Sequence, residues 1–118
     1  MGNDTFGKVG EDLAEKYLVK KEYYILAKNY QSKFGGVDII ASDGKSIIFI
    51  EVKTRRDNQS GTSLDAITKG KINNMVKSSQ FYLSQRNLHG QHYRFDAVEV
   101  IIKQDEKPII NHLLNIAY

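Results

Sequence analysis

The sequence contains no cysteine, which excludes disulfide bonds and thiolate zinc sites and agrees with a reducing cytoplasm. No apolar run approaches the length of a membrane span, and residues 1–4 lack the pattern of a signal peptide. Internal repeats, low-complexity segments and linkers are also missing, and Pro108 is the only proline. We therefore expect one cytoplasmic domain over residues 1–118, with no membrane partner.

The composition is that of an ordinary soluble globular protein, with 41% hydrophobic and 26% charged residues. The formal net charge of +3 is a mild indication of nucleic acid or another polyanion as a partner. Many neutral enzymes carry as much charge, so the motifs have to decide the function.

Residues 35–41 and 46–53 form two apolar, β-branched runs on either side of the turn-rich residues 42–45. Because Asp43-Gly44 between such runs is a strong turn signal, the pattern predicts a β-hairpin.

Three charged residues, Asp38, Glu51 and Lys53, interrupt this hairpin. Side chains alternate along a strand, so Glu51 and Lys53 share one face. Pairing about the turn sets Asp38 opposite Phe49, which places Asp38 on the Glu51 face. A register shift of two leaves this result unchanged.

Two carboxylates on one face of a hydrophobic hairpin need a cation, because buried charges are paired or hold a metal. Lys53 is one candidate cation, and a hard divalent ion such as Mg2+ is another. The residues leave both open, together with a strand end that simply reaches solvent with an ordinary Glu–Lys pair.

The remaining segments predict a mixed α/β sheet covered by helices, in the order helix, three strands, helix, two strands. The first helix is expected to be capped by Asp4 or Thr5 and to close at Lys20-Lys21. A strand follows over 23–27, and residues 29–33 either continue it or form a polar connection. The remaining expected elements are a loop over 54–63, a helix from Ser63 to about Arg86, and strands over 93–102 and 109–114.

Four further charged residues have more than one interpretation. Glu11 is either a solvated carboxylate of the first helix or a group aimed over the sheet edge at the charged face. Arg55 and Arg56 either bind phosphate or belong to a mobile solvated loop. Lys71, one turn after Ile67, neutralises the acidic face, contacts phosphate or reaches into solvent.

The order of these motifs resembles the PD-(D/E)XK nuclease superfamily, and more closely the YraN-type bacterial family, which is similar to archaeal Holliday-junction resolvases. The resemblance implies a restriction-endonuclease-like α-β-β-β-α-β core with a central mixed sheet flanked by helices. It rests on residues 7–14, 35–38 and 49–55, on Lys71, on Arg94-Phe95-Asp96 and on residues 115–118.

The resemblance implies a metal-dependent endonuclease that hydrolyses phosphodiester bonds. Asp38, Glu51 and the carbonyl of Val52 would bind one or two Mg2+ (or Mn2+) ions. Lys53 would position or deprotonate the attacking water, and Glu11 would hold metal or water.

Lys71, Arg55 and Arg56 would contact the nucleic-acid backbone, and DNA is the expected partner. Because backbone contacts carry little sequence information, we expect an enzyme that selects structure, such as branched or flapped DNA. Resolvase-like proteins often form dimers, so the resemblance also implies a possible homodimer. No sequence feature indicates where its interface would lie.

Two positions depart from the family pattern: Gly36 replaces a usual glutamate, and Glu22 replaces a usual helix-ending glycine. The loss at Gly36 motivates an alternative, a nucleic-acid-binding module of the same fold without catalysis. A third hypothesis is a protein-interaction domain with a structural Asp38–Lys53 pair.

Overall fold

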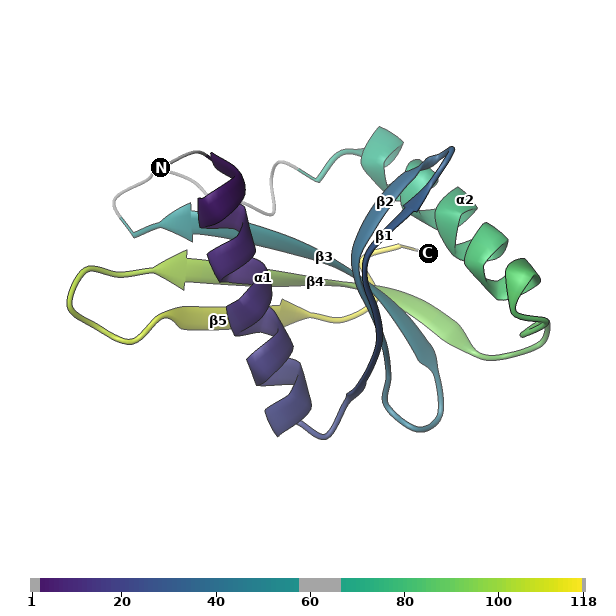
Figure 1. Cartoon of the computed structure of the whole chain (residues 1–118), viewed down its shortest axis with the longest axis horizontal. Coiled ribbons are helices and arrows are strands. Elements are labelled where there is room, and N and C mark those ends of the chain that lie inside the picture. Colours follow the sequence, from purple (N-terminus) through teal and green to yellow (C-terminus); the bar gives the residue numbers. More distant parts are fainter. Residues whose placement is uncertain (1–2, 58–66, 118) are drawn as a thin grey trace.

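The computed structural model describes residues 3–57 and 67–117. Its elements follow the predicted order of helix, three strands, helix and two strands (Figure 1). They are α1 (Asn3–Lys20), β1 (Tyr24–Ser32), β2 (Gly35–Ser42), β3 (Ile47–Arg56), α2 (Lys69–Gln85), β4 (Tyr93–Ile102) and β5 (Ile109–Leu113).

The strands form one five-stranded sheet in the order β1-β2-β3-β4-β5. β3 and β4 run parallel, and the other neighbouring pairs are antiparallel, so the predicted mixed sheet is confirmed. Within the described ranges, no helix is long and apolar enough to cross a membrane.

Alternation along β3 divides the core into two layers. Ile48 and Ile50 pack with Ala14 and Leu18 of α1 on one face of the sheet. Phe49 packs on the other face, in the cluster that includes Met75, Tyr82 and Leu83 of α2. The two helices therefore cover opposite faces (Figure 1), and an odd-numbered residue of β3 lies on the α2 side.

The predicted helix starts were wrong. α1 begins at Asn3, so Asp4 and Thr5 lie inside it. α2 begins at Lys69, and Ile67 is not helical. The physical reason is Thr68, whose hydroxyl accepts the Lys71 N–H at 3.1 Å and caps the helix. The expected cap Ser63 lies outside the described residues.

Of the two alternatives for residues 29–33, the structure shows the continued strand, since β1 runs to Ser32. The predicted loop after Lys53 was wrong, because β3 continues to Arg56. The extension of β3 follows from its parallel partner, since β4 pairs with it as far as Arg56 and Ile102.

The register of the β2–β3 hairpin is shifted by two from the prediction. Phe49 pairs with Ile40, not with Asp38. The turn is longer than Asp43-Gly44, because the Asp43 carboxylate accepts the N–H groups of Lys45 and Ser46 at 2.9 and 2.7 Å. Asp38 stays on the Glu51 face, as expected for an even shift.

The C-terminus of α1 has a geometry that usually favours glycine at position 22. Glu22 has φ 71°, in the left-handed region. The N–H of Tyr23 bonds the Leu18 carbonyl and that of Glu22 bonds Val19, both at 2.9 Å. This is a Schellman ending in which a glutamate adopts the conformation that glycine accepts more easily.

Gly10 sets how closely α1 approaches the sheet. A Cβ at Gly10 would collide with the side chain of Thr54 on β3, so only glycine fits at this crossing. The same crossing fixes the position of Glu11, the next residue of the helix. Gly7, one turn earlier, faces open space.

We predict opposite effects of alanine at these two glycines. Gly10→Ala forces α1 away from β3 and should lower the free energy of unfolding by about 1–3 kcal/mol. Gly7→Ala only reduces the conformational entropy that the chain loses when α1 forms, so it should raise the free energy of unfolding by about 0.5–1 kcal/mol. Urea denaturation followed by circular dichroism measures both, and adding Thr54→Ala to Gly10→Ala should recover part of the loss. Equal stability of the two alanine variants would contradict this packing.

Candidate functional site

The sheet divides where Asp38 and Glu51 lie. β2 pairs with β3 only from Ile39–Ile50 to Ser42–Ile47. Before Ile39, β2 keeps β1 as its partner, and after Ile50, β3 keeps β4. The β1–β2 hairpin accordingly turns away from the end of β3 and lies against α2 (Figure 1).

The Asp38 side chain takes over a hydrogen bond at this division. Its Oδ2 accepts the backbone N–H of Val52 at 2.8 Å. The carboxylate thereby replaces the missing strand partner of β3, and β3 in turn fixes the carboxylate. The backbone of Val52, the predicted source of a carbonyl ligand, thus lies beside Asp38.

Glu51 is a buried carboxyl group, with 4% of its surface exposed. Burial, then hydrogen bonding with Asp38 and the charge of Asp38, raise the pKa of Glu51 to about 7. Lys71 opposes this rise, with its Nζ 3.1 Å from Oε2 of Glu51. The two predicted carboxylates are therefore close together, on the α2 side of the sheet.

Glu11 lies near Asp38 on the first helix. Burial, followed by the charge of Asp38, raises the pKa of Glu11, while a hydrogen bond with Asn29 opposes the change. Glu11 is partly buried, and the effect of Asp38 on its pKa places it on the side of the acidic residues. Even so, residues 3–57 and 67–117 contain no group of three His, Asp or Glu side chains that could enclose a metal.

Lys53 is not the lysine that pairs with the acidic residues. It follows Glu51 by two residues on the same face of β3 and is partly buried. Among the described residues no Asp38–Lys53 ion pair forms, and Lys71 takes the role of counter-ion to Glu51. The structural pair of the third hypothesis is thus absent from this part of the chain.

Arg55 and Arg56 lie on β3, not on the predicted loop, and both contact the protein itself. Arg55 Nε lies 3.2 Å from Oε2 of the buried Glu99. The guanidinium of Arg56 lies over the ring of Phe6, 4.6 Å from its centroid. These contacts give both side chains a structural role.

Sequence reasoning missed a second buried carboxylate, Asp96, whose side chain is fully buried. Arg94, His112 and the N–H of Asn115 surround it at 3.1, 2.8 and 3.0 Å. Burial acts to raise the pKa of Asp96, but these partners outweigh it and the pKa is lowered. The available signal was an aspartate inside an apolar strand, two residues after an arginine on the same face.

Comparison with known proteins places this arrangement in a family. The family model described as "Uncharacterised protein family UPF0102" matches residues 10–100. The chain belongs to this family. The match includes Glu11, Asp38, Glu51, Lys53 and Lys71.

Relatives in UPF0102 match along almost their whole length. A UPF0102 protein of Syntrophomonas wolfei is 37% identical over 113 residues, covering 96% of this chain and 97% of the relative. One of Trichlorobacter lovleyi is 39% identical over 115 residues, covering 97% and 91%. One of Clostridium botulinum (strain Kyoto) is 43% identical over 101 residues, covering 85% and 82%.

The raised pKa of Glu51 predicts how stability depends on pH. From its ordinary value of 4.5 up to about 7, the folded metal-free protein holds a proton that the unfolded chain releases. The free energy of unfolding should therefore fall as pH rises through this window, by about 3 kcal/mol, and level off above it. Urea denaturation at pH 5, 6, 7 and 8 with a chelator measures the slope.

Glu51→Gln is the matched control for this slope, because it keeps the shape and removes the titration. Asp38→Asn should reduce the slope but keep part of it, since burial is the larger cause of the shift. A pH dependence in Glu51→Gln equal to that of the wild type would show that another group is responsible.

Proposed function

We propose that this protein is a metal-dependent endonuclease that hydrolyses phosphodiester bonds in nucleic acid. The observation that carries the proposal is the pair Asp38 and Glu51, which the division of the sheet brings together with Lys53 two residues further along β3. Their mutual repulsion favours a divalent cation between them.

The donor set fits Mg2+ or Mn2+. Mg2+ is commonly held by one or two carboxylates and completes its shell with water and substrate phosphate. Asp38, Glu51 and the carbonyl of Val52 would supply the protein ligands, so a third acidic side chain is not required. When bound, the ion would neutralise phosphate charge and lower the pKa of a nearby water.

The other side chains have separate roles in this proposal. Lys53 holds an ammonium on the same face, where it can orient the water or stabilise charge that develops on the phosphate. Glu11 lies near Asp38 on α1, the helix on the other face of the sheet from α2, and can hold a water molecule. Lys71 is paired with Glu51 in the metal-free protein. When the cation binds, the Lys71 ammonium can leave Glu51 and contact a substrate phosphate.

The proposed substrate is DNA recognised by its structure, such as a branched or flapped duplex. Lys71, which is exposed on α2, supplies a backbone contact without sequence information. Arg55 and Arg56 are engaged with Glu99 and Phe6, so their predicted phosphate contacts need these partners to be released. Dimerisation is still a prediction.

An inactive binding module of the same fold is the second candidate, and Gly36 favours it. A glutamate at position 36 would lie two residues before Asp38 and on the same face of β2. In this chain the space is filled by the Gln31 amide, which a Cβ at Gly36 would meet at 2.7 Å. This candidate predicts DNA binding that weakens with salt, and no cleavage.

Cleavage assays on duplex, flapped, four-way and single-stranded DNA, with Mg2+ or Mn2+, test the proposal. Glu51→Ala and Glu51→Gln should each lower cleavage at least about 100-fold. Glu51→Gln should unfold at the same temperature or higher, because it removes a buried charge. Cleavage that survives both substitutions would end the catalytic assignment. DNA binding without any cleavage by the wild type would support the inactive module.

Gly36→Glu should improve metal binding, because it adds a carboxylate beside Asp38 and only the flexible end of Gln31 has to move. We expect about tenfold tighter Mg2+ binding by titration calorimetry. Gly36→Gln is the control of equal size without charge. Equal affinities of the two variants would show that a side chain at position 36 does not reach the site.

A further inference from the structure

The turn between β1 and β2 carries an aromatic side chain, Phe34, that is partly buried but lies outside the core. Lys33 and Phe34 are the two residues of this turn, since Ser32 pairs with Gly35. Phe34 belongs to neither hydrophobic cluster. Its ring instead faces two ammonium groups, with Nζ of Lys33 and of Lys77 at 5.3 and 5.9 Å from its centroid. The positive φ of this turn, 129°, belongs to Gly35, so the backbone accepts most side chains at position 34 and does not itself select phenylalanine.

Hydroxyl groups fix the turn to α2. The Oγ of Ser32 accepts the N–H of Phe34 at 3.1 Å and lies 2.8 Å from the Oγ of Ser78. Ser78, fully buried on α2, also donates to the Gly35 carbonyl at 3.2 Å. The ring of Phe34 is therefore held on a rigid support, which lowers the entropic cost of stacking against a ligand.

The positive charge of the chain is concentrated around this support. Residues 66–95 contain no Asp or Glu, whereas the rest of the chain holds 12 basic and 14 acidic residues. Lys69, Lys71 and Lys77 of this segment are exposed on α2. A one-sign surface of this kind attracts a polyanion.

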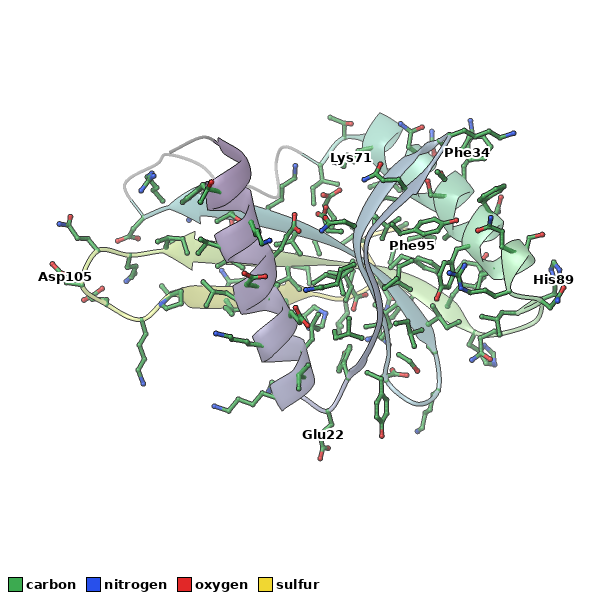
Figure 2. All side chains as sticks on the ribbon, viewed as in Figure 1. Glu22, Phe34, Lys71, His89, Phe95 and Asp105 are labelled. Atoms are coloured by element: carbon green, nitrogen blue, oxygen red, sulfur yellow. The ribbon has the colours of Figure 1, made fainter. Side chains whose placement is uncertain are left out.

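The turn and the acidic site are connected by one strand. Phe34 directly precedes β2, and Asp38 lies four residues further along the chain, a distance of about 13 Å if the segment is extended. Figure 2 shows Phe34 and Lys71 on the same, upper side of the molecule in this view. Lys71 in turn contacts Glu51 of the acidic site.

We propose that Phe34 is a stacking platform for an unpaired base, with Lys33 and Lys77 binding the adjoining phosphates. An aromatic face beside cations is the usual means of holding single-stranded nucleic acid. In a stacked strand of a DNA duplex, about 13 Å corresponds to about four base steps. The substrate therefore has an unpaired nucleotide about four steps from the bond that is cut. This inference rests on the proposed function and narrows its substrate to forks, flaps and junctions.

Binding of fluorescent DNA by the full chain, without divalent metal, tests the platform. Wild type should bind a forked duplex more tightly than a blunt duplex of equal length. Phe34→Ala should weaken fork binding about 5- to 100-fold with little effect on the blunt duplex, and Phe34→Tyr should restore it. Tyr24→Ala is the matched control, because Tyr24 is an exposed aromatic at the other end of the same strand.

A fluorescent adenine analogue, 2-aminopurine, in the unpaired arm gives a second readout. Its emission should be quenched by wild type and by Phe34→Tyr, but not by Phe34→Ala. Equal binding and quenching by wild type and Phe34→Ala would overturn the platform, whether or not the protein cleaves DNA. Fork-selective binding that depends on Phe34, without metal-dependent cleavage, would support the platform and overturn only the catalytic assignment. Absence of all DNA binding would overturn both.

Discussion

The repulsion between Asp38 and Glu51 is the constraint on which the rest of the site depends. Two carboxyl groups within hydrogen-bonding reach, one of them 4% exposed, are stable only with a proton or a cation between or beside them. In the metal-free protein a proton on Glu51 and the ammonium of Lys71 meet this need. In the proposed metal-bound state a divalent ion would take over both roles.

The fold creates this constraint by ending one strand pairing early. β2 and β3 separate after Ile39 and Ile50, and each keeps a different partner beyond that point. The two helices then reach the opening from opposite faces of the sheet, α1 with Glu11 and α2 with Lys71. The opening is maintained by backbone pairing elsewhere in the sheet, and the Asp38 carboxylate adds one hydrogen bond across it, from the Val52 N–H.

Local patterns predicted the hairpin and the shared face of Asp38 and Glu51, because side-chain alternation survives an even register shift. They left Lys71 open between neutralising the acidic face, contacting phosphate and reaching into solvent; the structure pairs it with Glu51, which depends on where α2 packs. They missed the extension of β3, which depends on β4, and the start of α2, where Thr68 caps. The resemblance to a nuclease family supplied the element order, which the structure confirms, while the chemistry is proposed.

A comparison of two of the buried acidic residues, Asp96 and Glu51, separates structure from function. Asp96 accepts hydrogen bonds from Arg94, His112 and the Asn115 N–H, and its pKa is lowered although it is fully buried. Glu51 is nearly as buried but has a second carboxyl group as its neighbour, and its pKa is raised. A carboxylate whose surroundings satisfy it stabilises a fold. One whose surroundings oppose its charge costs stability, and this cost is understandable where the charge is kept for a ligand.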